Sequence, residues 1–258
     1  MPRAAALSAA CGWNQTTADW RLFLRHGRAR GLDDGHPDCL AATAAVLPYG
    51  HDLAWISMVL VRPDLRRRGF ATALMRWALD ALPGRRCLAL DATPEGRPVY
   101  RRLGFADAWT FTRWSLPDAL PAGGIAVSAA PDPGAARMLD REAAGAPREP
   151  LLRHLFARLP AAALAAKGGA VLGRDGRLAS QIGPVLARDT PTARALLAHA
   201  RSAVSGPLIA DLRDGTDLAS WIAAAGGTPR RPFTRMFRGA PPVCDDTLLH
   251  AVAGPEFG

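Results

Sequence analysis

The sequence has 258 residues, of which 49% are hydrophobic and 21% are charged, and its formal net charge is +9. No apolar run reaches the roughly 18–20 residues that a membrane span needs, which excludes an integral membrane protein and predicts no membrane partner. The four cysteines are scattered, with no Cys-x-x-Cys pair and no neighbouring histidine cluster. This spacing argues against a zinc site or a disulfide framework, and it predicts a cytoplasmic protein without a bound metal.

The basic side chains are almost all arginine, since Lys167 is the only lysine among 32 basic residues. GC-rich coding produces such a skew, so the charge says little about partners. The adjacent arginines are dispersed along the chain and form no single basic tail. A phosphate-bearing ligand could use some of them. We do not favour a nucleic-acid partner, and a nucleic-acid-binding protein is a third hypothesis that depends on charge alone.

Residues 116–135 contain four prolines and three glycines, a density typical of a linker. We place a domain boundary there, which gives residues 1–118 and 119–258. Before it, the pattern predicts a strand over 55–61, an amphipathic helix from residue 70 to 81, a strand at 87–91, a helix around 95–103 and a strand at 109–115. Beyond it, the pattern predicts a strand near 179–187, a helix with Thr190 as N-cap, a strand at 208–211, a helix at 215–225 and a strand at 231–237. Strands that alternate with helices predict an α/β layer fold in each half.

Short stretches of the first half recur in the second. Phe111-Thr-Arg113 returns as Phe233-Thr-Arg235, and Leu88-x-x-Asp91 returns as Leu208-x-x-Asp211. The elements that carry them follow in the same order, which predicts an internal duplication.

The segment from Val61 to Met75 predicts a cradle for a pyrophosphate. A buried strand ends, Pro63 turns the chain, and a loop with the single glycine Gly69 opens directly into a helix. Such a junction presents unpaired backbone N–H groups and the positive end of the helix dipole to one point. Gly69 lets the backbone approach the ligand and Ala71 leaves room beside it, while the low glycine count fits neither a Walker loop nor a Rossmann fingerprint.

Two motifs resemble those of the GNAT superfamily of N-acetyltransferases. Val61 to Ala71 reads V-x-P-x-x-R-x-x-G-x-A, similar to its acetyl-CoA-binding loop, and Tyr100 to Phe105 reads Y-x-x-L-G-F, similar to its second signature. The stretches 12–20 and 232–236 narrow the resemblance to a bacterial subgroup with a second, degenerate GNAT-like domain. The resemblance implies a tandem α/β fold in which each lobe is a mixed, mostly antiparallel sheet flanked by helices.

The resemblance also implies a site. Acetyl-CoA would be the co-substrate, bound by strand and loop residues Met58, Val59, Leu60, Val61, Arg66, Arg67, Arg68, Gly69, Phe70, Ala71 and Thr72. Tyr100 matches the tyrosine that protonates the departing sulfur in relatives, and the alternative is a core tyrosine. The acceptor pocket would be bordered by Trp13, Asn14, Gln15 and Trp20, which lie between the first two helices, and by Trp55. The alternative is that these are ordinary core and cap residues.

The general base is not evident, because no carboxylate lies on the strand from Trp55 to Val61. His51, Asp52 and Asp91 are nearby candidates, and a chain of ordered waters is an equal alternative. Because Asp91 recurs as Asp211, we expect both to have a structural, helix-capping role.

The second half departs from the pattern that the resemblance implies. It has Asp189 where the phosphate loop should be, and a negative charge there would repel a pyrophosphate. Ile222 stands at the position that corresponds to Tyr100. We therefore expect the second half to be a substrate-side or structural lobe.

These features predict an acetyl-CoA-dependent N-acetyltransferase that acts on the primary amine of a small molecule. The alternative is a non-catalytic acyl-CoA-binding sensor or scaffold, which the missing carboxylate favours. The sequence leaves the oligomeric state open.

Overall fold

The computed structural model describes residues 1–258 of the chain. The strands are β1 (Arg28–Leu32), β2 (Ala42–Tyr49), β3 (Leu53–Val61), β4 (Cys87–Ala92), β5 (Ala106–Ser115), β6 (Val127–Ala129), β7 (Leu164–Ala166), β8 (Gly169–Arg174), β9 (Ser180–Ala187), β10 (Leu208–Arg213), β11 (Thr228–Gly239) and β12 (Leu249–Val252). The α-helices are α1 (Pro2–Ala10), α2 (Thr17–His26), α3 (Phe70–Asp80), α4 (Arg97–Arg102), α5 (Gly134–Ala144), α6 (Glu149–Arg158), α7 (Thr190–Ala203) and α8 (Asp217–Ala224). Short 3-10 helices occupy Pro63–Leu65, Pro160–Ala162 and Asp246–Leu248.

All strands join one sheet of 12, in the order β1-β2-β3-β4-β11-β5-β10-β12-β9-β8-β7-β6. Only β3–β4 and β9–β10 pair in parallel, and the other pairs are antiparallel. The predicted class, a mixed and mostly antiparallel sheet flanked by helices, is confirmed. The two expected half-sheets are continuous with each other, because β11 pairs with β5 at the centre. No helix is long and apolar enough to cross a membrane.

The predicted elements agree with the observed ones to within a few residues at their ends. One helix start is wrong by one residue, since the N-cap of α7 is Asp189 and not Thr190. The Asp189 carboxylate accepts a hydrogen bond from the backbone N–H of Thr192 at 2.8 Å. This bond satisfies an amide in the first turn of the helix, which otherwise has no acceptor.

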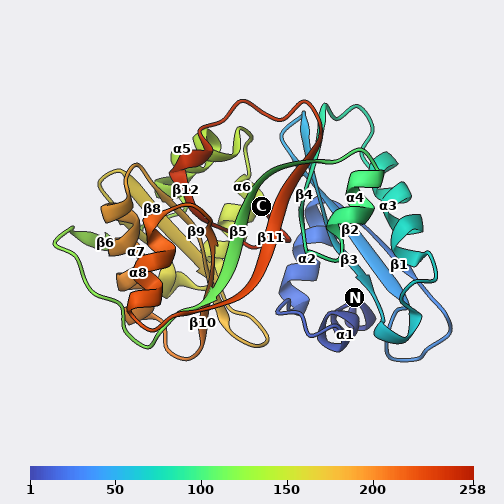
Figure 1. Cartoon of the computed structure of the whole chain (residues 1–258), viewed down its shortest axis with the longest axis horizontal. Coiled ribbons are helices and arrows are strands. Elements are labelled where there is room, and N and C mark those ends of the chain that lie inside the picture. Colours follow the sequence, from blue (N-terminus) through green and yellow to red (C-terminus); the bar gives the residue numbers. More distant parts are fainter.

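The two halves exchange strands β5 and β11. Strand β11 of the second half pairs with β4 of the first, and β5 of the first half pairs with β10 of the second. Figure 1 shows β5 in green and β11 in red side by side between the two lobes. Phe111 and Phe233 are register partners at the centre of this pair, and their rings stack at 5.1 Å. The duplicated residues thus occupy equivalent places on either side of the β5–β11 pair. The domain boundary at residue 118 stays a prediction.

In the first lobe, β3 and β4 separate partway along their length. They pair only where Leu53–Trp55 lies beside Cys87–Ala89. Beyond that point β3 has an irregular register with β2, and Met58 adopts a left-handed conformation with φ +54°. The hydroxyl of Thr43 donates to the carbonyl of Met58 at 2.9 Å and holds this irregularity in place. A gap therefore opens between the carboxyl-terminal ends of β3 and β4.

In the second lobe the corresponding gap is filled by the chain itself. Strands β9 and β10 pair in parallel over Ser180–Ile182 and Leu208–Ala210. Strand β12 then lies between them, with Leu249 and Ala251 paired to β9 and Ala251 and Val252 paired to β10. The second lobe thus repeats the separation of the first and occupies it with its own strand.

The packing is continuous across the two halves. One core cluster of 33 buried residues includes Trp20, Trp55, Phe111, Leu151 and Phe257. Helices α3 and α4 lie at one end of the molecule, and α7 and α8 lie at the other (Figure 1). Burial of apolar side chains from both halves in one cluster fixes the lobes relative to each other.

Candidate functional site

A cavity of about 920 Å³ extends from the gap between β3 and β4 to the start of α3. It brings together most residues of the predicted site: Trp13, Met58, Val59, Leu60, Val61, Arg66, Arg67, Gly69, Phe70, Ala71, Thr72 and Tyr100. Of the predicted cofactor residues, only the exposed Arg68 does not line it.

The start of α3 forms an open cradle at one end of the cavity. Gly69 is the N-cap in a left-handed conformation with φ +85°, and a Cβ atom there would meet nothing within 4 Å. The first backbone bond of the helix runs from Ala73 N to Gly69 O at 3.0 Å, so the amides of Phe70, Ala71 and Thr72 donate to no protein acceptor. Unpaired amides at the positive end of a helix dipole bind anions. The cradle therefore fits a pyrophosphate.

The edge of β3 that faces β4 supplies a second set of polar backbone groups. Beyond Trp55 this edge has no strand partner, and Ile56 to Val61 line the cavity. Extended backbone with unpaired N–H and C=O groups can hydrogen-bond the amides of a linear ligand that lies beside it. This geometry fits the pantetheine arm of a coenzyme A molecule whose pyrophosphate sits in the cradle.

Tyr100 projects from α4 into the same cavity. Its ring packs edge-on against Phe105 at 6.3 Å, and its hydroxyl makes no hydrogen bond to the protein. Burial raises the pKa of Tyr100 to about 12, because the charged phenolate is disfavoured away from water. The hydroxyl is thus protonated at neutral pH and free to donate.

Asp91 also lines the cavity, but both of its oxygens are already engaged. Arg235 donates to them at 2.9 and 2.8 Å, and the Asp91 side chain is 0% exposed. The guanidinium stacks over Trp55 and Trp109, at 4.7 and 4.3 Å from the ring centroids. Burial raises the pKa of the Asp91 carboxyl, and the ion pair with Arg235 opposes that shift.

The expected helix-capping role of Asp91 and Asp211 is wrong. Asp211 accepts two bonds from Arg113, each 2.8 Å long, just as Asp91 does from Arg235. Each repeated aspartate therefore pairs with the repeated arginine of the other half, across the exchanged strands. A guanidinium offers two parallel N–H donors to a carboxylate. For these two aspartates in the interior of the sheet, that pairing takes the place of a helix cap.

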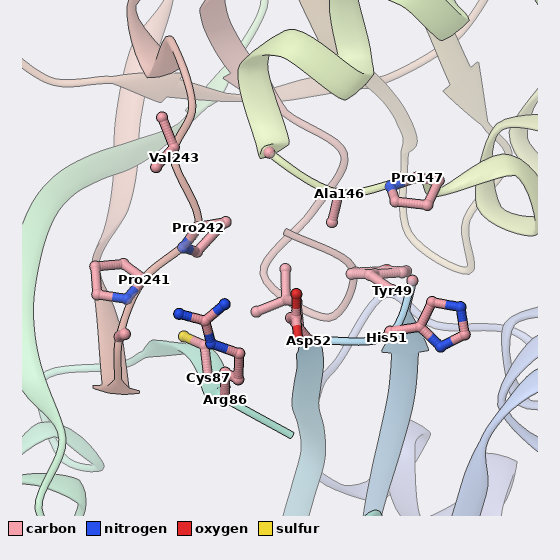
Figure 2. Close-up of a pocket in the computed structure, with 14 residues that line it drawn as sticks. Tyr49, His51, Asp52, Arg86, Cys87, Ala146, Pro147, Pro241, Pro242 and Val243 are labelled. Atoms are coloured by element: carbon pink, nitrogen blue, oxygen red, sulfur yellow. The ribbon is translucent and has the colours of Figure 1, made fainter. Parts of the chain in front are cut away.

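The other two candidates for the general base lie at the opposite end of β3. His51 and Asp52 border a smaller cavity of about 310 Å³, together with Arg86, Cys87 and residues 145–147 and 240–243. Figure 2 shows Asp52 and Arg86 facing this space, where the segment before β4 meets the second lobe.

Four of the five predicted acceptor residues do not line the large cavity. Asn14 holds the loop before β9: its Nδ2 donates to Ala179 O at 2.9 Å, and its Oδ1 accepts from Leu178 N at 2.8 Å. Gln15 and Trp20 are buried, and the Trp20 indole donates to the Ser8 hydroxyl at 3.1 Å. The fifth, Trp13, lines the cavity.

Trp55 is buried and its indole donates to the carbonyl of Pro255 at 3.3 Å. That bond leads to residues that the sequence patterns did not single out. Pro255 and Glu256, which follow β12, line the cavity of the first lobe. The Glu256 side chain is buried, its Oε1 is paired with Arg174, and its Oε2 has no hydrogen-bond partner. The sequence signal that could have identified Glu256 is that it is the only acidic residue between Leu248 and Gly258.

The equivalent place in the second lobe is closed. The Asp189 carboxylate occupies the start of α7 by accepting from Thr192 N, and Ile222 is fully buried. No group of three or more His, Cys, Asp or Glu side chains is placed to hold a metal ion.

Comparisons with known proteins agree with this architecture. The model of the acetyltransferase (GNAT) family matches residues 9–105, and that of an acetyltransferase (GNAT) domain matches residues 136–249. No curated protein matches the chain.

Three solved structures are similar to the chain. A protein from Pyrococcus horikoshii assigned as an acetyltransferase is 21% identical, with a TM-score of 0.72 over 86% of this chain and 78% of its own. A GCN5-related N-acetyltransferase from Kribbella flavida is 25% identical, with a TM-score of 0.56 over 92% of this chain and 68% of its own. A tandem GNAT protein from the clavulanic acid biosynthesis pathway is 18% identical, with a TM-score of 0.58 over 93% of each chain. The chain belongs to the GNAT acetyltransferase family, as a tandem of two GNAT domains.

Proposed function

We propose that the protein is an acetyl-CoA-dependent N-acetyltransferase that acts on the primary amine of a small molecule. Membership of the GNAT family supports acyl transfer from a coenzyme A thioester in general. The observation that carries the proposal is one continuous cavity that joins the open cradle at Gly69 to the free hydroxyl of Tyr100.

The reaction is the aminolysis of a thioester. The enzyme holds the two reactants, accepts a proton from the amine and donates a proton to the leaving thiolate. The amides of Phe70 to Thr72 hold the pyrophosphate, with Arg66 and Arg67 beside it, and the free edge of β3 holds the pantetheine arm. Tyr100 protonates the leaving sulfur, which its high pKa permits at neutral pH. Trp13 borders the acceptor side.

We further propose that residues 1–118 are the catalytic domain and that residues 119–258 are a second, degenerate domain. The cradle and Tyr100 both come from the first segment, whereas Asp189 and β12 close the equivalent places in the second. The four cysteines are unpaired, which supports the cytoplasm as the location.

Release of free thiol from acetyl-CoA, measured with a thiol reagent across a library of primary amines, tests the proposal. We expect turnover with at least one amine, and loss of that turnover in Tyr100→Phe. Tight coenzyme A binding, unchanged in Tyr100→Phe and accompanied by no turnover with any amine, would instead support a non-catalytic acyl-CoA sensor.

A further inference from the structure

We infer that Glu256, delivered by the second domain, binds the acceptor as an ammonium ion and takes its proton. The acceptor is then an amine that is cationic at neutral pH. This inference rests on the proposed acetyl transfer and assigns the acceptor end of the same cavity.

The segment that carries Glu256 is held on both sides. It leaves β12 in the filled gap of the second lobe and crosses to the first lobe. There the Trp55 indole donates to Pro255 O at 3.3 Å, and the Tyr49 hydroxyl donates to Phe257 O at 2.8 Å. These bonds to the flanking residues fix the backbone of Glu256 against β2 and β3.

The carboxylate itself is oriented by a buried arginine. Arg174, on β8, is 0% exposed and pairs with Oε1 of Glu256. The same guanidinium donates to Gln181 Oε1 at 2.9 Å and lies 3.3 Å from a carboxylate oxygen of Asp19. The charge-assisted bond from Arg174 therefore fixes one oxygen of the carboxylate and sets the direction of the other.

Oε2 of Glu256 is buried and has no partner. A buried oxygen of an ionised carboxylate without a donor is costly, because its hydration is lost and nothing replaces it. The other buried acids at the junction of the lobes have both oxygens engaged: Asp19 by Arg158, Arg174 and the Thr16 amide, Asp91 by Arg235, Asp140 by Arg148, and Asp211 by Arg113. Among these buried acids, only Glu256 has an oxygen without a donor, and Glu256 lines the cavity.

A primary ammonium supplies the missing donor. It carries three N–H groups and a positive charge, and charge-assisted bonds to a carboxylate are the stronger kind. The ammonium transfers one proton to Oε2, which frees the nitrogen lone pair. The nitrogen then bonds to the acyl carbon as the carbon–sulfur bond breaks, and Tyr100 gives its proton to the sulfur. The second proton lost by the nitrogen restores the tyrosine, and the proton on Glu256 passes to solvent.

The test compares Glu256→Gln with a matched control, Glu142→Gln, whose side chain is 42% exposed on α5 and pairs with Arg188. The glutamine keeps the size of Glu256 and an acceptor for Arg174 but takes no proton. We expect kcat/KM for the amine to fall by about 100-fold or more in Glu256→Gln, within the usual range for general acid–base groups. The Kd for acetyl-CoA, the melting temperature and the control variant should change little. An unchanged kcat/KM in folded Glu256→Gln would overturn the assignment.

A binding measurement decides the same point without turnover. We would titrate benzylammonium, and benzyl alcohol as its neutral analogue, into the coenzyme A complex by calorimetry. We expect the cation to bind more tightly than the alcohol, and this preference to disappear in Glu256→Gln but not in Glu142→Gln. Equal binding of the two ligands, no binding of the cation, or equal binding of the cation to all variants would refute the inference. Absence of thiol release with every amine would refute the proposed function, and the titration would still decide the role of Glu256.

Discussion

Replacement of Gly69 tests the cradle by adding one charge at the start of α3. In Gly69→Asp the carboxylate projects into open space, since a Cβ atom at this position meets nothing within 4 Å. Gly69→Asn is the matched control, because asparagine has nearly the same shape without the charge. Both residues tolerate the left-handed conformation that Gly69 adopts at φ +85° better than other side chains do. The difference between the two variants therefore isolates the electrostatic effect.

Coulomb's law gives the expected size of that effect. Two unit charges about 6 Å apart repel by about 0.7 kcal/mol at the dielectric constant of water and by about 2.8 kcal/mol at an effective value of about 20. Gly69 is exposed, so the result should lie between these limits. We expect the Kd for coenzyme A to be about tenfold higher in Gly69→Asp than in Gly69→Asn, a difference of about 1.4 kcal/mol.

Isothermal titration calorimetry of the wild type and both variants with coenzyme A measures this difference. The gap between the variants should narrow as salt is raised, because salt screens exposed charges. Equal affinities for the aspartate and asparagine variants would show that the pyrophosphate does not sit at the start of α3, whatever the loss relative to wild type.

Two further predictions concern catalysis and stability. Tyr100→Phe should lower kcat by about 100-fold while the Kd for acetyl-CoA stays nearly constant, because general-acid help acts mainly in the transition state; a drop in melting temperature with kcat preserved would indicate a core tyrosine instead. Asp19→Ala should cost about 3–5 kcal/mol in urea unfolding, since it leaves Arg158 and Arg174 buried without their shared partner. Burial alone would raise the pKa of Asp19, but Arg174, His154 and Arg158 hold it well below its ordinary value. Its stabilising contribution should therefore be full above about pH 4 and decline as the pH falls further, and Asp19→Ala should show a flatter acid limb; parallel acid limbs would contradict this.

The sequence predicted those residues of the site that are close together in the chain. Strand β3, the turn at Pro63, Gly69 and helix α3 are consecutive in the chain, so apolar periodicity and turn chemistry specify them together. The same holds for α7, where Ala193, Leu196, Leu197 and Ala200 recur at helical spacing and are buried. Even there the N-cap was misplaced by one residue, because Asp189 and Thr190 are both good caps.

The strand exchange could not be predicted from the same patterns. The repeats identify Arg113 with Arg235 and Asp91 with Asp211, but each arginine could pair within its own half or with the other. Each residue lies on the same strand in either pairing. The two pairings therefore differ only in the order of the strands in the sheet. That order depends on long-range packing, such as the stack of Phe111 on Phe233, and leaves no periodicity in the sequence.

The residues at the proposed acceptor end could not be predicted from the sequence, for a related physical reason. Asn14 lies next to Trp13 in the chain, yet only Trp13 reaches the cavity, because Asn14 is occupied by backbone groups of residues 178 and 179. Glu256 reaches the cavity from the far end of the sequence. Asn14 bonds to Ala179, 165 residues away, and Glu256 pairs with Arg174, 82 residues away, so no local pattern extends to either contact.

The filled gap in the second lobe and the open gap in the first are connected by one segment of chain. If β12 did not lie between β9 and β10, the residues after it would not be held where they enter the first lobe. The second domain has an aspartate where a cradle would be, so occupation of its gap removes no binding site. The duplicated fold thus leaves one gap open as a cavity and fills the other with β12, which anchors the segment that borders that cavity. On this view the second domain positions acceptor-side groups, a role that its closed helix start and buried Ile222 leave available to it.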